Sequence, residues 1–259
     1  MVLTICPLEI QSYKCVRIMY VALFYSTTFI TEYISAHDDQ VTNSCQSLVA
    51  KPKYDGVCNC FQQLLEIRCD GLKHVPQFSG FSCVFAGVYM AKQLIRQLEA
   101  NAFAHLPTRR LVLDFNDIED RLHPTAFSGN LSETIQELYL GACRLHDLPP
   151  GVFDNMSSLI VLHLWHNTIK QVPAGLFISC GNLRELVLSH NIIVSLDVNA
   201  FIGLRNLRKL DLDYNEISVL SHEVFDGLTN LQVTNFILLV YYYCINSKIN
   251  AVPYSMNRR

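Results

Sequence analysis

The chain has 259 residues, of which 50% are hydrophobic and 17% charged, with ten cysteines and a formal net charge of -3. This length allows one domain or at most two, and the hydrophobic content excludes wholesale disorder. A pI near 6.3 without a block of lysine and arginine argues against a nucleic-acid ligand. Ten cysteines are many for a cytosolic domain, so the composition indicates a globular chain from an oxidising compartment.

The first element is an uncharged stretch over residues 18–31, preceded by Lys14 and Arg17 and followed by Glu32. A membrane span needs about 20 apolar residues, whereas the core of a signal peptide needs about 7–15. We therefore expect residues 1–36 to be a cleaved secretory signal, with Met19 as an alternative start. A short signal anchor and a mis-assigned start are the other interpretations.

Residues 37–80 follow, with four cysteines in the order C…C-x-C…C, and residues 81–231 then repeat one pattern about every 24 residues. The clearest copy consists of Leu159, Leu162, Leu164, Asn167, Ile169, Val172 and Phe177. The same residue types recur 24 and 48 residues later, ending at Phe201 and Phe225. A preceding copy begins at Ile135, and looser copies begin at Thr108 and Phe85. Six copies in series predict a repeat architecture.

The spacing within a copy has a physical reason. Alternating Leu-x-Leu predicts a short strand with its leucines facing inward and the residues between them facing outward. The asparagine falls where the chain turns, and its amide can satisfy backbone groups that would otherwise be buried unpaired. Cys143 replaces this asparagine in one copy. A phenylalanine spine is expected along the opposite side, formed by Phe103, Phe127, Phe153, Phe177, Phe201 and Phe225.

This pattern resembles the 24-residue leucine-rich repeat of extracellular proteins such as Slit, chaoptin, the Nogo receptor, Toll and hormone-receptor ectodomains. The resemblance implies an α/β solenoid, a horseshoe with short parallel strands on the concave side and an irregular or 3-10 convex side. It also implies a concave or lateral surface that binds a protein ligand in adhesion, guidance or recognition.

The resemblance further identifies residues 37–80 as an N-terminal cysteine-rich cap with the pairs Cys45–Cys60 and Cys58–Cys69. A zinc site is the alternative, since sequence alone allows three pairings of four cysteines. We expect Cys143 and Cys180 to be buried thiols, and Cys83 and Cys244 have no assigned role.

The pattern is lost after Leu231, so residues 232–259 are expected to be an anomalous tail from a truncated or mis-spliced transcript. Its apolar stretch, residues 236–245, is too short to span a bilayer as a helix. Membrane attachment through a missing C-terminal region stays open.

Because the inward positions are core, we expect binding on the outward positions of the strands and the turns that follow. The candidate ligand-binding residues are Tyr89, Phe115, Tyr139, His163, Trp165, His166, His190, Asp211 and Tyr214. Exposed aromatic residues with a few polar groups are typical of binding hot spots. His166 and His190 should lie on adjacent strands about 5 Å apart, and with His163 they suggest a metal site or a pH-sensitive contact as secondary hypotheses.

Two glycosylation sequons begin at Asn130 and Asn155, on the side away from the concave strands. No catalytic or phosphate-binding motif is found, so we expect neither an enzyme nor a cofactor. The sequence predicts a secreted or cell-surface protein that binds an unidentified protein and no nucleic acid. The alternatives are a fragment of a receptor ectodomain and an accessory subunit of a secreted enzyme.

Overall fold

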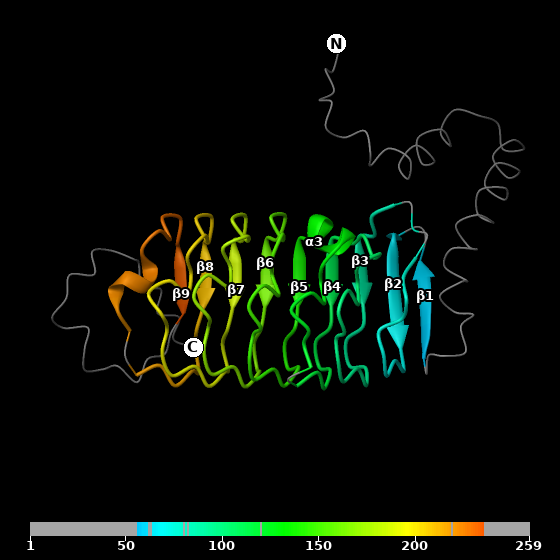
Figure 1. Ribbon diagram of the computed structural model, residues 1–259, viewed down its shortest axis with the longest axis horizontal. Coiled ribbons are helices and arrows are strands. Elements are labelled where there is room, and N and C mark those ends of the chain that lie inside the picture. Colours follow the sequence, from blue (N-terminus) through cyan, green and yellow to red (C-terminus); the bar gives the residue numbers. More distant parts are fainter. Residues whose placement is uncertain are drawn as a thin grey trace, which may run out of the picture.

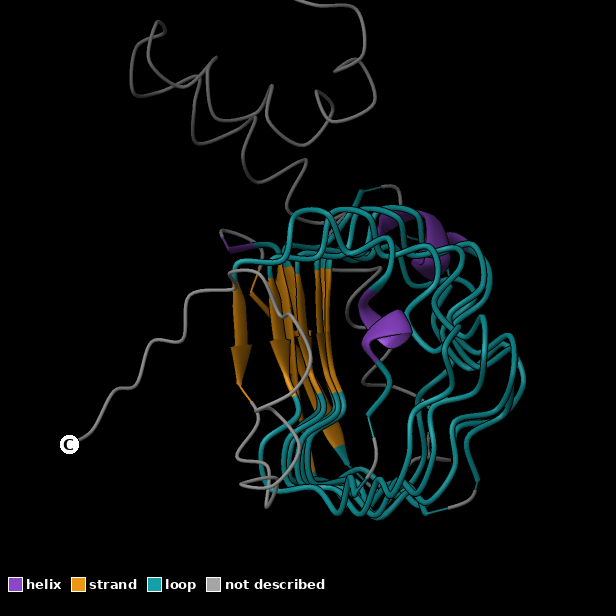
Figure 2. Ribbon diagram, turned by 90° about the vertical axis from the view of Figure 1, so that its left-hand side faces the viewer, coloured by secondary structure: helices purple, strands orange, loops and turns teal. Residues whose placement is uncertain are grey.

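The computed structural model describes residues 56–235, apart from residues 62, 63, 80, 82, 120 and 219. Within these residues, nine short strands lie side by side in one sheet, and their order in the sheet is their order in the chain (Figure 1). The strands are β1 (Val57–Phe61), β2 (Glu66–Asp70), β3 (Gly87–Tyr89), β4 (Arg110–Val112), β5 (Glu137–Tyr139), β6 (Val161–His163), β7 (Glu185–Val187), β8 (Lys209–Asp211) and β9 (Val233–Asn235). Seen end-on, the strands form one wall of a coil that turns and loops close on the other side (Figure 2).

The register of the sheet follows from the Leu-x-Leu pattern. β1 and β2 are antiparallel, and every later pair is parallel. The central leucines of successive strands are directly opposite one another, so that Leu138 pairs with Leu162, Leu162 with Leu186 and Leu186 with Leu210. All four are completely buried. The predicted solenoid with short parallel strands is therefore confirmed.

The core runs the length of the coil, between the sheet and a row of phenylalanines. Five of the six predicted spine residues are essentially inaccessible to solvent: Phe103, Phe127, Phe153, Phe177 and Phe201. Phe103 stacks on Phe127 and Phe153 stacks on Phe177, each pair with ring centroids 5.7 Å apart. Burial of such a ring is worth roughly 1.5–3 kcal/mol.

Two details of the spine differ from the prediction. Phe78 in the cap extends it, with its ring 6.3 Å from that of Phe103. Phe225 is only partly buried, because the last described turn contains a 3-10 helix, η3 (His222–Phe225), whose buried residue is Val224.

A ladder of buried amides follows the strands. The Asn167 Oδ1 accepts the N–H groups of Cys143 and Leu145 at 2.9 and 3.0 Å. The Asn167 Nδ2 donates to the carbonyls of Leu140 and Leu164 at 2.8 and 2.9 Å. Asn116, Asn191 and Asn215 make equivalent bonds one or more turns away. These side chains satisfy backbone groups that no neighbouring strand reaches.

Two ladder positions have no asparagine, and their neighbouring backbone groups are hydrogen-bonded in a different way at each. Gln93 occupies the first, where its Oε1 accepts the Leu72 N–H at 3.0 Å and its Nε2 donates to the Cys69 carbonyl at 3.1 Å. At the second, the Cys143 thiol donates to the Leu113 carbonyl at 3.2 Å. No amide oxygen is required there, because the Ile118 N–H bonds to the backbone carbonyl of Cys143.

The opposite side of the coil consists mainly of turns. An extra turn of helix, α3 (Asn130–Thr134), accommodates a longer repeat between β4 and β5. A second, exposed series of side chains links successive coils next to the strands, with Asn182 donating to Ser157, Asn206 to Gly181 and Asn230 to Arg205 at 2.8 Å each. Side-chain bonds therefore join neighbouring repeats at two places.

At the N-terminal end of the described region, one predicted disulfide is present. The Cys58–Cys69 disulfide joins β1 to β2, as the resemblance implied. Cys60 is also disulfide-bonded, while Cys45 lies outside the described residues, so the pair Cys45–Cys60 stays a prediction. The zinc alternative requires four free thiolates, and three of the four cysteines are in disulfides instead.

The sheet continues past Leu231, because β9 pairs with β8 and places Thr234 opposite Leu210. The strand thus enters the segment assigned to the tail. The predicted signal sequence, the apolar stretch at residues 236–245 and Cys244 lie outside the described residues. In the described part of the chain, no helix has the length and apolar character needed to cross a membrane.

Candidate functional site

Each turn of the coil presents outward side chains at fixed positions. On β6 these are Val161 and His163, which flank buried Leu162, and Trp165 and His166 follow in the turn. The residue before each ladder position has left-handed backbone, with φ of 61° at Phe115, 56° at both His166 and His190 and 55° at Tyr214. This repeated conformation, uncommon for aromatic residues, aligns equivalent side chains on successive turns.

Five of the candidate residues form one continuous cluster, here called the aromatic row: Phe115, Trp165, His166, His190 and Tyr214. The rings of Phe115 and Trp165 meet edge to face at 5.5 Å, and the His190 and Tyr214 rings stack at 4.3 Å. The ring centroids of His166 and His190 are 5.5 Å apart, which confirms the expected spacing of adjacent strands. The row is accessible, since Phe115 is 48% and Tyr214 is 58% exposed.

Trp165 is half-buried because it lies over the neighbouring turn. A Cβ atom added to Gly141 would lie 2.3 Å from Trp165 Cε2 and 2.4 Å from its Nε1. The absence of a side chain at position 141 is therefore what allows the indole to lie flat there. Trp165 therefore packs against its neighbours and still takes part in the accessible row.

A second row of polar contacts crosses the same face at the strands, here called the ionic row: Arg110, Glu137, Tyr139, His163, Glu185 and Lys209. The Arg110 guanidinium holds both carboxylate oxygens of Glu137, at 2.6 and 2.9 Å. Glu185 bonds to the Lys209 ammonium at 2.7 Å and to His163 Nε2 at 3.3 Å. Tyr139 and His163 connect the two pairs, with ring centroids 4.8 Å apart.

The ionic row shifts the pKa values of its acids. The hydrogen bond from Arg110 is the main cause that lowers the pKa of Glu137, against the opposing effect of burial. Burial alone would raise the pKa of Glu185, but Lys209 and His163 together hold it below its ordinary value. Burial, and then the bond to Glu137, raises the pKa of Tyr139 to about 12, so its hydroxyl stays a donor. The charges of these pairs compensate one another within the face.

Asp114 has a different environment, next to the aromatic row. Its Oδ1 accepts the Gly141 N–H at 2.6 Å, and no cation pairs with it among the described residues. Burial raises the pKa of this carboxyl, against the effects of the Gly141 bond and of His163. Asp114 is thus a partly desolvated carboxylate without a counter-ion.

The remaining candidates lie apart from the aromatic row. Tyr89 lies near the cap, with the Arg68 guanidinium 5.4 Å from its ring. Tyr139 and His163 belong to the ionic row. Asp211 accepts the Asp213 N–H at 3.2 Å, on β8. Val187, also at an outward position, is buried between His163 and Asp211 of the adjacent strands.

Sequence reasoning missed the charged members of the ionic row and Asp114. Arg110, Glu137, Glu185 and Lys209 all stand at the first position of their strands, with opposite charges on adjacent β4 and β5 and on adjacent β7 and β8. That shared register position was the available signal. The metal hypothesis for the histidines gains nothing, because the described residues contain no group of three or more side chains that could hold a metal ion.

The sequons lie where the sequence placed them. Asn130 is the first residue of α3 and Asn155 lies in a turn, and both are exposed on the side away from the strands. Cys143 and Cys180 are buried, and burial raises the pKa of each thiol to about 12. They are core residues without a part in the candidate site.

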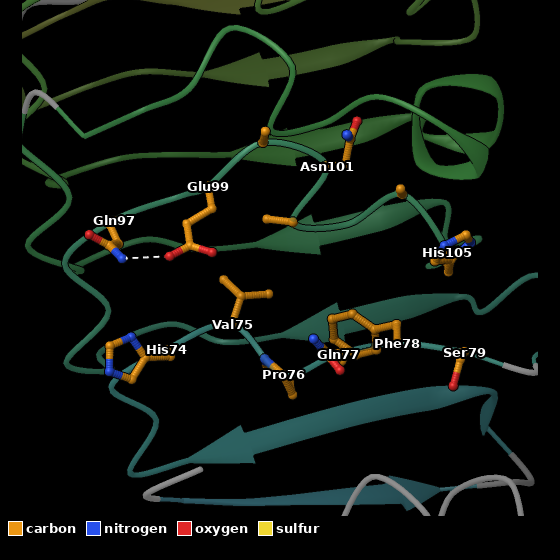
Figure 3. A pocket seen from close by; sticks show the side chains of 13 residues that line it. His74, Val75, Pro76, Gln77, Phe78, Ser79, Gln97, Glu99, Asn101 and His105 are labelled. Atoms are coloured by element: carbon orange, nitrogen blue, oxygen red, sulfur yellow. Dashed lines mark hydrogen bonds between the residues drawn. The ribbon is translucent and has the colours of Figure 1, made fainter. Parts of the chain in front are cut away.

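A cavity of about 680 Å³ lies elsewhere, between the cap and the first repeat (Figure 3). Phe78 and short alanines contribute to its wall, and Gln97 donates to Glu99 at 2.8 Å. His74 and His105 lie at opposite ends of it (Figure 3). Because its titratable groups do not converge on one point, the aromatic row is the better candidate.

Comparisons with known proteins agree with this architecture. The sequence model described as leucine rich repeat matches residues 133–193 and 181–233. No curated protein sequence matches the chain significantly. Among solved structures, the chain is similar to TLR13 in its complex with ssRNA13, with 33% identity, a TM-score of 0.54 and coverage of 59% of this chain and 21% of that one. It is also similar to Drosophila Toll in its complex with Spatzle, with 27% identity, a TM-score of 0.53 and coverage of 57% and 20%. The chain spans about a fifth of the length of either structure.

Proposed function

The chain is a leucine-rich-repeat protein whose repeats resemble those of Toll ectodomains, and we propose that it is a non-catalytic extracellular module that binds a protein on its concave face. The aromatic row is the observation that carries the proposal. Five rings in mutual contact run across several repeats, and Phe115 and Tyr214 leave about half of their surface open. Tryptophan and tyrosine are enriched among the few residues that carry most of the binding energy at protein interfaces.

The charge of the face favours a protein over a nucleic acid. Acidic side chains outnumber basic ones at the outward positions, and three basic ones, Arg68, Arg110 and Lys209, are already paired with glutamates. A polyanion needs a surplus of free lysine and arginine to release counter-ions from its phosphates. The TLR13 structure contains an RNA, whereas the Drosophila Toll structure contains the protein Spatzle. The aromatic and acidic surface of this chain supports a ligand of the second kind.

The test is a binding screen with matched variants. The full chain, fused to a multimerising tag, is applied to an array of extracellular proteins, and each hit is titrated. A Trp165→Ser, Tyr214→Ser double variant should reduce affinity at least about a hundredfold, because each ring is a hot-spot residue. The control is Ile178→Ser with Ile202→Ser, which removes two exposed apolar residues at 61% and 46% exposure from the opposite side. Binding lost in the control and kept in the aromatic variant would overturn the proposal.

The extracellular part of the proposal rests on the cap disulfide and the sequons. Disulfides persist in secreted proteins, and exposed Asn130 and Asn155 lie away from the proposed binding face. Expression in a secretory eukaryotic cell should give medium-borne protein whose mass falls on deglycosylation. Asn130→Gln and Asn155→Gln should each remove one glycan. Retention of unglycosylated, reduced protein in the cytosol would contradict the assignment.

A second candidate is part of a receptor ectodomain, favoured by the likeness to Toll-type structures of which this chain matches about a fifth. In that case the same repeats would be joined to a membrane anchor. Sequencing the transcript beyond the codon for Leu231 distinguishes the two candidates, because a receptor predicts further repeats and a membrane span.

A further inference from the structure

We propose that the concave face recognises an arginine side chain of its protein ligand, held between the Asp114 carboxylate and the Trp165 indole with Phe115 beside them. The inference rests on the proposed function and specifies the chemistry of its ligand. Three observations carry it: the unpaired carboxylate, the ring pair next to it, and the surplus of acidic charge on the surrounding strands.

The Asp114 carboxylate is built to receive a donor. The Gly141 N–H fixes it through Oδ1 at 2.6 Å, and the described residues provide no bond to Oδ2. Burial penalises its negative charge, which is why its pKa is raised. A guanidinium bonded to Oδ2 would compensate that penalty, since charge-assisted hydrogen bonds are the strong ones in proteins.

Gly141 also places the indole beside this carboxylate. Asp114 contacts the backbone N–H of Gly141, and the Trp165 ring lies where a Gly141 side chain would stand. The two groups therefore flank one residue. The Phe115 ring, on the residue after Asp114, meets Trp165 at 5.5 Å and completes an aromatic corner.

Cations already lie over other rings of this face. The Arg68 guanidinium is 5.4 Å from the ring centroids of both Phe61 and Tyr89, and the Lys92 ammonium is 5.7 Å from that of Phe115. Among the described residues, no cation lies over Trp165. Tryptophan is the best side chain for such contacts, and arginine the more frequent cation. Trp165, the ring type most suited to a cation, is thus without one in the described part of the chain.

The surrounding charge favours a cationic ligand over a neutral one. Carboxylates at outward positions of the strands and following turns include Glu66, Asp70, Asp114, Glu137, Glu185, Asp211 and Asp213. The basic residues at the same positions are Arg68, Lys92, Arg110 and Lys209. Arg68, Arg110 and Lys209 are each balanced by a glutamate of the same set, so the excess negative charge comes from the four aspartates against Lys92. The face as a whole therefore presents a negative potential to an approaching ligand.

The test uses the single tryptophan of the chain as its reporter. Purified full-length chain is titrated with N-acetyl-arginine amide at constant ionic strength, and Trp165 fluorescence is followed. N-acetyl-citrulline amide, a neutral isostere, is the matched probe. We expect saturation by the arginine probe at a concentration on the order of 1–10 mM and no saturation by citrulline.

The variants separate the contributions of charge and ring. Asp114→Asn keeps an oxygen that accepts the Gly141 N–H, so the fold is retained while the charge is lost, and arginine affinity should fall about tenfold. Phe115→Leu should weaken it about threefold. Asp154→Asn, an exposed carboxylate on the opposite side, should change nothing. A matching urea midpoint for Asp114→Asn and the parent shows that the fold is intact.

The outcomes distinguish this inference from the proposed function. Equal responses to arginine and citrulline, or unchanged affinity in Asp114→Asn, would overturn the arginine site. A response to N-acetyl-lysine amide equal to that for arginine would also overturn it, because the flat guanidinium is the group that stacks on an indole. The array screen above does not use these probes, so the protein-binding proposal can survive loss of the arginine site.

Discussion

Removing one buried amide is the sharpest test of how the repeats hold together. Asn167→Ala deletes the side chain that accepts from Cys143 and Leu145 and donates to Leu140 and Leu164. The Leu164 carbonyl keeps a bond from Asn191 at 3.0 Å, so three backbone groups lose their only hydrogen-bond partner among the described residues. Asn167 is 6% exposed, and water reaches these groups poorly.

The expected cost is about 3–5 kcal/mol, since each buried polar group left unpaired costs about 1–3 kcal/mol and the vacated space admits some water. A typical domain has only about 5–15 kcal/mol of stability, so the loss is large. Urea unfolding measures it, with circular dichroism for the whole coil and Trp165 fluorescence for the turn that contains the substitution. Both signals should shift to lower urea, because neighbouring repeats stabilise one another.

Asn206→Ala is the matched control, because Asn206 also donates across repeats, to the Gly181 carbonyl at 2.8 Å, but on the exposed side. Water can replace that bond, so the cost should stay below about 1 kcal/mol. If the free energies of unfolding of the two variants differ by less than about 1 kcal/mol, the ladder does not hold the repeats together as argued.

Three further outcomes are expected. Gly141→Val should displace the Trp165 ring, shift its emission to longer wavelength and lower the free energy of unfolding by about 1–3 kcal/mol. Gly181→Val is the control, because an added Cβ there meets nothing closer than 3.9 Å, and it should leave the emission unchanged. The pKa of Glu137 is lowered in the folded state, so its ion pair stabilises fully above the unfolded pKa and loses that effect as pH falls through the folded-state pKa. Glu137→Gln should therefore cost about 0.5–1 kcal/mol at neutral pH and progressively less as the pH of the urea titrations is lowered, and a pH-independent cost would contradict this. With pKa values raised to about 12 by burial, Cys143 and Cys180 should resist alkylation in the native chain and react once it is unfolded, as peptide mass mapping can show; native labelling at either thiol would refute their burial.

The fold was predictable because its determinants are periodic. Leu138, Leu162, Leu186 and Leu210 form an unbroken series at the predicted register, and the sequence pattern reports that directly. Exceptions to the pattern were harder to anticipate. The roles of Gln93 and Cys143 depend on which backbone groups each turn leaves unpaired, and this requires coordinates.

The candidate site was predictable only in part. Periodicity identified the outward positions and hence the aromatic row, of which Phe115, His166, His190 and Tyr214 fall at one column of the repeat and Trp165 at the column before it. Periodicity did not predict side-chain conformations, because the placement of Trp165 depends on the lack of a side chain at Gly141 on the neighbouring turn. The Arg110–Glu137 pair also escaped notice, since outward charges carry no periodic apolar signal.

One structural device serves both stability and recognition. The ladder amide of Asn167 fixes the turn in which His166 has left-handed backbone, and the ladder amide of Asn191 does the same beside His190. Each turn therefore presents the side chain of the residue before its ladder position in the same orientation, whatever the type of that residue. The residues that contact a ligand can change without disturbing the leucine core, while loss of a ladder amide should destabilise the binding face and the coil together.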